Sequence, residues 1–393
     1  MGYRILTLNS ISMRGLERLP RDRYEVASEI LHPDAVLVRS ADMHAQELSP
    51  SVLAVARAGA GTNNIPVAAL SRRGVPVFNA PGANANAVKE LVLAGMLLAA
   101  RNICQAWEFA RGLTGDDAAL DLAVEQGKKA YVGFELPGRT LGVIGLGAVG
   151  VLVANSAEAL GMKVLGYDPQ ITVQRAWQLS STVQQALSLD DLFARSELIS
   201  VHVPLLEATR GLVNATRLRL MRAGGVVLNF ARAPIVIESD IVAALDSGHL
   251  HAYVSDFPTA ALKDHRRAIT LPHLGASTLE AEDNCAIMAA ETLREFLEHG
   301  NIRNSVNFPE AVLPRQPGCT RIAIANSNVP NMVGQISTCL ASAGINIAEM
   351  LNRSRGEYAY TLLDTESTAD AALIERLRGI EGVLSARLVR APD

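Results

Sequence analysis

The chain has 393 residues, of which 49% are apolar, so it can bury a sizeable core and is expected to form two or three domains. Its 36 basic and 40 acidic residues give a net charge of −4, and no long run of either sign forms a nucleic-acid footprint. A DNA or RNA partner is therefore not expected.

Two further features bear on where the protein works. The longest apolar run, residues 91–100, is bounded by Glu90 and Arg101 and is too short to span a bilayer, which predicts no membrane partner. The cysteines lie far apart without metal-ligand spacing, and the N-terminus has no signal-peptide pattern. We expect a cytoplasmic protein with reduced thiols and no metal site.

The first 110 residues predict a parallel sheet. Short β-rich runs alternate there with helical patterns, and a long helix is expected to begin near Asn86. The β-rich runs cover residues 3–10, 35–40, 52–61 and 75–80.

Residues 139–274 repeat this alternation, which predicts a second α/β unit. A helix is expected around 278–300, and the proline-containing segment 301–318 reads as an extended linker. The expected strands of the second unit lie within 139–147, 163–169, 198–204, 225–230, 252–257 and 268–272.

Residues 321–390 have a different character. Their patterns give strand, helix, two strands, helix and strand, and this βαββαβ order predicts a ferredoxin-like unit. The small unit contains no convincing catalytic grouping. The predicted fold class is α/β, with two doubly wound Rossmann-like domains followed by a ferredoxin-like domain.

A glycine-rich turn lies between a predicted strand and a predicted helix in TLGVIGLGAVG, residues 140–150. Gly145 would make the tight turn, Gly147 would let the backbone approach a pyrophosphate, and Gly150 would allow close packing of helix on strand. The pyrophosphate would lie at the positive end of the helix. Alone the motif is weak evidence, because many glycine-rich turns bind no nucleotide.

Asp168 strengthens this interpretation because it stands at the end of the next predicted strand. A carboxylate there can accept both ribose hydroxyls and would repel the 2′-phosphate of NADP, which favours NAD. The alternative is an aspartate that only begins an Asp-Pro turn. The order strand, turn, helix, strand and acid predicts dinucleotide binding.

Arg232 and His273 are the candidate catalytic pair. Arg232 follows a predicted strand, and its planar guanidinium could bind a substrate carboxylate through two hydrogen bonds. His273 lies on a loop, and imidazole titrates near neutrality. Taken singly, Arg232 could instead form a surface ion pair, and His273 could be an ordinary hydrogen-bonded loop histidine. Together they stand at carboxyl ends of strands in the nucleotide sheet, where ligands of such sheets bind.

These segments together resemble the NAD-dependent D-2-hydroxyacid dehydrogenases, and within them the branch that acts on 3-phosphoglycerate. The resemblance extends over nearly the whole chain. It is carried by VRSA (38–41), ARAGAGTNNI (56–65), FNAPGANANAVKE (78–90), LPGRTLGVIGLGAVG (136–150), GYDP (166–169), NFAR (229–232), SDF (255–257) and LPHLGAST (271–278).

The resemblance implies NAD-dependent oxidation of D-3-phosphoglycerate to 3-phosphohydroxypyruvate, the first step of serine biosynthesis. His273 would take the hydroxyl proton while C2 gives hydride to the nicotinamide, and Arg232 would hold the carboxylate. Asp256 matches the position that binds the carboxamide end of the cofactor. The substrate and its phosphate would be held by Arg39, Ser40 and Arg57. Further cofactor contacts are expected at Ala148, Val149, Val203, Pro204, Phe230 and Ala231.

One position departs from the family pattern. The family supplies a glutamate shortly after the SDF segment, hydrogen-bonded to the histidine so that its imidazolium form is stabilised. Counting without gaps places Ala261 there, and a methyl group cannot perform that role. Asp264 could swing in from the shortened loop, His273 could work without a carboxylate partner, or activity could have been lost.

The C-terminal unit resembles an ACT domain, a small amino-acid-binding unit usually used across a dimer interface. Asn328 and Asn346 match positions that bind serine in serine-inhibited relatives, although two neighbouring residues of the ligand loop differ from the usual pattern. The alternative is a dimerisation module in which these asparagines only cap turns.

We expect a substrate domain formed by residues 1–95 and 284–310, a nucleotide domain at 96–283, a linker at 311–319 and an ACT domain at 320–393. The active site is expected in the cleft. The protein is expected to form a homodimer or homotetramer. Two rival functions stay open. One is a dehydrogenase for another 2-hydroxy acid, and the other is an NAD-bound amino-acid sensor without turnover.

Overall fold

The computed structural model describes residues 2–390. Its internal contacts divide the chain into two compact units, one formed by the segments before Ala85 and from Leu279 onward, the other by Ala85–Thr278. The predicted cuts at 95 and 283 fall instead inside two continuous helices, α3 (Ala85–Ala100) and α11 (Leu279–His299). Residues 1 and 391–393, which end two of the predicted domains, lie outside the described range.

The first unit contains a parallel five-stranded sheet in the order β2-β1-β3-β4-β5. Four of these strands were predicted, but β2 was not, because only one of its four residues is fully buried and they carry no strong alternation. Helix α11 packs against β4 of this sheet and supplies a stripe of small and apolar side chains to its core. The elements are β1 (Tyr3–Leu8), α1 (Met13–Leu16), β2 (Tyr24–Ala27), β3 (Ala35–Val38), β4 (Ala54–Arg57), α2 (Val67–Arg72) and β5 (Val77–Phe78).

The second unit contains a parallel seven-stranded sheet in the order β12-β11-β10-β9-β6-β7-β8. Its central strands are buried on both faces, as expected for a sheet covered by helices on both sides. Only the two-residue edge strand β8 was not predicted. The elements are β6 (Thr140–Ile144), α6 (Ala148–Ala159), β7 (Lys163–Tyr167), α7 (Val173–Ala176), β8 (Gln184–Gln185), α8 (Leu189–Arg195), β9 (Leu198–Val201), α9 (Ala215–Leu218), β10 (Gly225–Asn229), α10 (Glu238–Asp246), β11 (Leu250–Ser255) and β12 (Ala268–Thr270).

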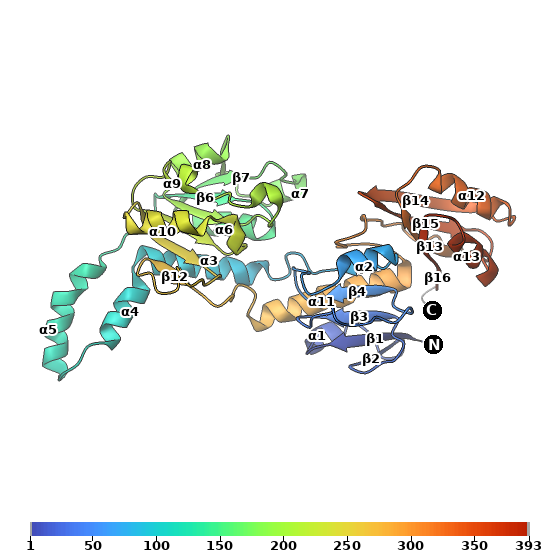
Figure 1. Ribbon diagram of the computed structural model, residues 1–393, viewed down its shortest axis with the longest axis horizontal. Coiled ribbons are helices and arrows are strands. Elements are labelled where there is room, and N and C mark those ends of the chain that lie inside the picture. Colours follow the sequence, from blue (N-terminus) through green and yellow to red (C-terminus); the bar gives the residue numbers. More distant parts are fainter. Residues whose placement is uncertain (1, 391–393) are drawn as a thin grey trace. The chain divides into compact units, whose positions relative to one another are not determined.

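Two helices of the second unit extend away from its sheet as an arm, α4 (Ile103–Arg111) and α5 (Asp117–Gly127), shown in teal in Figure 1. The Asp116 carboxylate caps α5 by accepting a hydrogen bond from the Ala119 amide, 3.0 Å away. Neither helix contains a buried residue, and the Trp107 side chain is largely exposed. The arm was not predicted from the sequence.

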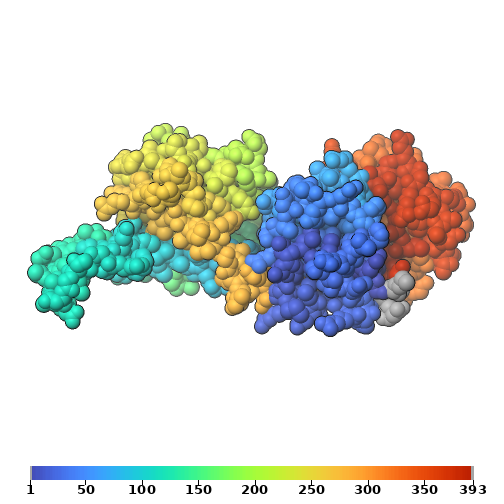
Figure 2. Space-filling view, turned by 60° about the horizontal axis from the view of Figure 1, so that its bottom comes forward, coloured from blue at the N-terminus to red at the C-terminus, as the bar shows by residue number. Residues whose placement is uncertain are grey.

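The C-terminal segment forms a four-stranded antiparallel sheet in the order β14-β15-β13-β16, with two helices on one face. This is the predicted βαββαβ order. Figure 2 shows this C-terminal domain (red) against the five-stranded domain (blue), and the two share one hydrophobic core. The elements are β13 (Thr320–Ser327), α12 (Met332–Ala341), β14 (Ile347–Arg355), β15 (Tyr358–Thr365), α13 (Ala371–Arg378) and β16 (Val383–Val389). Among the described residues, no helix is long and apolar enough to cross a membrane.

Candidate active site

The glycine-rich turn joins β6 to α6, and its three glycines have different surroundings. Gly145 has a φ of +89°, and a Cβ there would lie 2.8 Å from the His202 carbonyl oxygen. A Cβ on Gly150 would lie 1.9 Å from the Gly145 carbonyl oxygen, whereas one on Gly147 would meet nothing within 4 Å. Gly145 and Gly150 therefore permit tight packing, and Gly147 leaves open space where a pyrophosphate would approach the N-terminus of α6.

Asp168 stands just past β7, the strand beside β6. One carboxylate oxygen accepts a hydrogen bond from the Leu146 amide at 2.8 Å, and the other accepts one from the Gln170 amide at 2.9 Å. The carboxylate is thus fixed against the glycine-rich turn and is only half-buried, so its remaining lone pairs can accept ribose hydroxyls. The residues present fit an NAD cofactor.

The other predicted cofactor residues lie at the same edge of the sheet. Because β6, β9 and β10 are neighbouring parallel strands, their carboxyl ends meet there. These ends lead into Ala148 and Val149, Val203 and Pro204, and Phe230 and Ala231, respectively.

Arg232 is exposed, and the turn that carries it is fixed by a buried amide. The Asn229 side chain, fully buried at the end of β10, donates to the Arg232 carbonyl at 3.0 Å and accepts from the Ala231 amide at 3.2 Å. The Arg232 guanidinium donates to the Ala231 carbonyl at 2.7 Å. The backbone of this turn is therefore held while the guanidinium faces solvent.

His273 is exposed on a loop whose backbone is held by Asp256. The Asp256 carboxylate, 1% exposed, accepts hydrogen bonds from the amides of Leu274 at 2.7 Å and Gly275 at 2.8 Å. The Asp256 carbonyl also accepts from the His273 amide at 3.1 Å. His273 has a φ of +54°, an unfavourable value for a residue with a Cβ, which these contacts maintain. Its ring makes an edge-to-face contact with the Phe257 ring, with the centroids 5.2 Å apart.

No acidic side chain takes the place of the family glutamate beside His273 within residues 2–390. Ala261 is exposed. Asp264 forms an ion pair with Lys263 and lines a hollow together with residues of α4. Asp264 therefore contacts Lys263 rather than His273. The His273 ring has no carboxylate partner within 4.0 Å among the described residues.

Arg39 and Arg57 lie at the carboxyl ends of β3 and β4, neighbouring parallel strands of the first unit. The Arg57 side chain donates to the Arg39 carbonyl at 3.0 Å, and the Ser40 amide donates to the Asn9 side chain at 3.1 Å. The Arg39 guanidinium forms an ion pair with Glu282 of α11. Glu282 balances the charge of Arg39, and Arg57 adds a second cation at the same sheet edge, which suits an anion. Glu282 was not identified from the sequence because it is distant along the chain.

Sequence reasoning also missed His202, which stands behind the glycine-rich turn. Its ring is hydrogen-bonded to the Ser200 hydroxyl at 2.8 Å, and its amide donates to the Ile144 carbonyl at 2.7 Å. Burial lowers the pKa of His202 to about 4, so the ring is neutral at physiological pH. A lone histidine after a strand gives no signal in the sequence that it is buried and neutral beside the glycine-rich turn.

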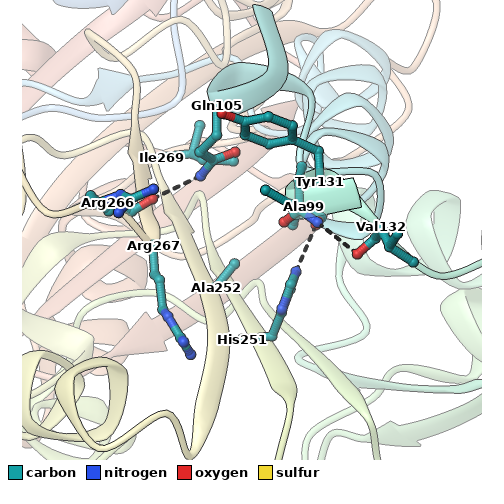
Figure 3. A pocket seen from close by; sticks show the side chains of 11 residues that line it. Ala99, Gln105, Tyr131, Val132, His251, Ala252, Arg266, Arg267 and Ile269 are labelled. Carbon is teal, nitrogen blue, oxygen red and sulfur yellow. Dashed lines mark hydrogen bonds between the residues drawn. The ribbon is translucent and has the colours of Figure 1, made fainter. Parts of the chain in front are cut away.

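A separate cavity of about 360 Å³ lies at the base of the arm and contains none of the predicted site residues. Figure 3 shows Gln105 donating to the Arg266 carbonyl at 2.8 Å and His251 bonded to the Ala99 carbonyl at 3.1 Å. Its polar groups thus join α4 to the loop before β12, and β11 to α3. Within residues 2–390, no cluster of His, Cys, Asp and Glu is arranged to hold a metal ion.

Asn328 and Asn346, the predicted effector residues, are both exposed in the C-terminal domain. Asn328 follows β13, and its side chain donates to the Gly356 carbonyl at 3.0 Å. Asn346 precedes β14, and its carbonyl accepts from the Glu366 amide at 3.3 Å.

Comparison with known proteins agrees with this arrangement. Residues 93–275 match the NAD-binding domain of the D-isomer specific 2-hydroxyacid dehydrogenases. The D-3-phosphoglycerate dehydrogenase of Haemophilus influenzae is 32% identical over 355 residues, which cover 87% of this chain and 82% of that protein. The chain belongs to the D-3-phosphoglycerate dehydrogenase family. The family member from Mycobacterium leprae is 32% identical over 383 residues, covering 93% of this chain and 70% of that protein.

Solved structures of the dehydrogenase family have the same fold. A 3-phosphoglycerate dehydrogenase of Entamoeba histolytica with bound NAD+ matches with a TM-score of 0.60 and 25% identity, covering 78% of this chain and 99% of that one. A protein of Thermus thermophilus matches with a TM-score of 0.62 and 26% identity, covering 77% and 99%. The predicted family, NAD cofactor and class of enzyme, an NAD-dependent oxidoreductase, are confirmed.

Proposed function

We propose that the protein oxidises D-3-phosphoglycerate to 3-phosphohydroxypyruvate with NAD, the first committed reaction toward serine. The observation that carries this is the group of Arg39 and Arg57 at one sheet edge, which suits a phosphate, in a chain that also has Arg232 for a carboxylate. The named activity of the relatives supports the same substrate.

In this mechanism His273 takes the proton of the C2 hydroxyl as the C2 hydride leaves. NAD, when bound, supplies the nicotinamide that accepts the hydride. Arg232 orients the substrate through its carboxylate, and Arg39, Ser40 and Arg57 hold its phosphate. Asp256 positions the His273 loop through two backbone amides, in addition to the predicted contact with the carboxamide end of the cofactor.

The test is NADH consumption with 3-phosphohydroxypyruvate between about pH 5 and 9. We expect His273→Ala to lower kcat by about 10²- to 10⁴-fold, the usual contribution of a general acid or base. Ala261→Glu should extend reduction to higher pH, because a carboxylate there favours the imidazolium form that donates the proton.

Two outcomes would redirect the assignment. If Arg57→Ala leaves the KM for the phosphorylated substrate unchanged, the substrate is another 2-oxo acid. If the wild type binds NADH but reduces no 2-oxo acid at any pH, the protein is an NAD-bound sensor, the reading that the alanine at 261 favours.

We further propose that the C-terminal domain is an ACT domain that binds serine through Asn328 and Asn346. Its βαββαβ topology supports this, as do the two exposed asparagines beside β13 and β14. Serine should inhibit the wild type and should inhibit Asn346→Ala about tenfold less strongly, the effect of losing about 1.4 kcal/mol of hydrogen bonding. Unchanged inhibition in Asn328→Ala and Asn346→Ala would place the effector elsewhere.

The exposed apolar side chains of the arm, including Trp107 and Leu122, support a homodimer or homotetramer. The four free cysteines support a reducing, cytoplasmic location. Sedimentation with and without the arm segment 103–131 tests the first point, and loss of self-association would support it.

A further inference from the structure

A cavity of about 370 Å³ lies where the C-terminal sheet packs against the five-stranded domain. It is lined from both sides, and it includes none of the residues assigned above to substrate, cofactor or serine. The first domain contributes Val52, Arg73 and Phe296, and the C-terminal domain contributes Arg378, Leu384 and Arg387.

The described lining of this cavity is cationic. It includes three arginines and no aspartate, glutamate or lysine. Arg73 donates to the carbonyls of Leu48 at 3.3 Å and Ser49 at 2.9 Å. These partners are neutral, so they fix the guanidinium in place without cancelling its charge.

Arg387 is held in a similar way. It donates to the Phe296 carbonyl at 2.5 Å, and its guanidinium stacks on the Phe296 ring, 4.5 Å from the centroid. Within residues 2–390, no carboxylate oxygen lies within 4.0 Å of the Arg73 or Arg387 guanidinium. Arg378 does pair with an acid, Glu375, but both of those side chains are exposed. Two oriented guanidinium groups therefore face one small cavity without a counter-charge.

We propose that this cavity binds a small organic anion, with its oxyanion group shared by Arg73 and Arg387. The apolar walls from Val52, Phe296 and Leu384 suit a short carbon skeleton, and the volume is at the lower end of the range for small-molecule sites. The class is a phosphorylated or dicarboxylic metabolite.

The position of the cavity suggests what an occupant would do. Arg73 precedes Gly74, whose φ is +69° and whose carbonyl accepts a hydrogen bond from Ser385 of β16 at 3.0 Å. A Cβ on Gly74 would lie 2.6 Å from the Ser385 hydroxyl, so the two domains already touch at this turn. An anion bound by Arg73 and Arg387 would join the same two elements and strengthen their docking.

The walls also belong to the elements through which the chain leaves this unit. The Arg73 turn leads into β5 and then to the crossing at Asn84, and Phe296 belongs to α11, which begins at the crossing at Leu279.

The experiment measures thermal unfolding of the full chain with saturating NADH, in the Arg57→Gln background that removes the proposed phosphate grip of the active site. Inorganic phosphate and succinate are titrated separately against chloride at constant ionic strength. At anion concentrations well above the Kd, we expect a rise in Tm of about 3 °C or more. A response to phosphate alone indicates a phosphorylated ligand, and a response to succinate alone indicates a dicarboxylate.

Arg73→Gln and Arg387→Gln should each raise the anion concentration needed for a given rise in Tm at least about tenfold. This is the effect on the Kd of losing one charge-assisted hydrogen bond. Arg72→Gln is the matched control, because Arg72 is exposed at the end of α2 and does not line the cavity. Leu384→Glu keeps both arginines and supplies an internal carboxylate, so it should abolish the response while the fold is retained. Failure of both anions to raise the Tm, or equal responses in Arg73→Gln, Arg387→Gln and Arg72→Gln, would overturn the proposal.

Discussion

Asp256 links the predicted cofactor site to the loop of the predicted catalytic histidine, a connection that the sequence did not reveal. Its side chain was expected only near the cofactor, yet it holds the backbone of the loop that carries His273. We expect Asp256→Asn to lower kcat by about 10- to 100-fold and stability by about 1.5–3 kcal/mol, because an amide has one acceptor oxygen for two backbone donors. Steady-state kinetics and urea unfolding measure the two effects. The exposed Asp264→Asn variant is the control, and equal losses in both variants would contradict this role.

The buried His202 should make the stability of the folded chain depend on pH. Its pKa is about 4 in the folded chain against an ordinary 6.5, so below pH 6.5 the unfolded chain binds a proton that the folded chain does not. This contribution to stability is fully present above pH 6.5 and is lost as the pH falls toward 4, to a total of at most about 3 kcal/mol. Unfolding measured at pH 7.5 and about pH 5 should show a smaller loss in His202→Gln than in wild type. An identical loss in the two proteins would show that His202 is not the group responsible.

The turn between β6 and α6 allows stability and cofactor binding to be separated at the scale of one element. In Gly147→Ala the new methyl group meets no protein atom within 4 Å, so we expect an unchanged Tm but NADH binding at least about tenfold weaker. In Gly150→Ala the methyl group would meet the Gly145 carbonyl, so both the Tm and NADH binding should fall. Thermal unfolding and NADH fluorescence titration distinguish the two variants. Tight NADH binding by Gly147→Ala would contradict the assigned approach of the pyrophosphate.

Elements with a strong local pattern were predictable from the sequence, and those that depend on tertiary contacts were not. The central strands are continuous apolar runs, and Gly145, Gly147 and Gly150 stand at fixed spacing, so both were found. The arm helices have no buried face in this chain, and β2 and β8 are short edge strands with little pattern of their own. Glu282 pairs with Arg39, which is distant along the chain, and the role of His202 depends on its burial beside a neighbouring strand. No spacing rule identifies either feature.

For the whole molecule, the buried Arg321–Asp364 pair fixes the C-terminal domain to the rest of its unit. Both side chains are fully buried, and the guanidinium also donates to the carbonyls of His299, Leu313 and Pro314. Asp364→Ala should destabilise the chain by about 3–5 kcal/mol, because it leaves a buried charge unpaired. Urea unfolding checks this against Glu366→Ala, which removes an exposed carboxylate from the same strand end. Joint replacement of the pair by Met and Leu should recover most of the loss, and failure to do so would assign the effect to packing.

The hydrophobic core shared by the first domain and the C-terminal domain limits how this protein can be rebuilt. Ala323, Tyr360, Leu362 and Val389 contribute to the same core as Phe296 and Phe308. A truncation that ends the chain near residue 311 would leave Phe296 and Phe308 uncovered and should yield an aggregating protein rather than a stable shorter enzyme. Exchange of C-terminal domains with relatives should therefore succeed only when both sides of this core are transferred together.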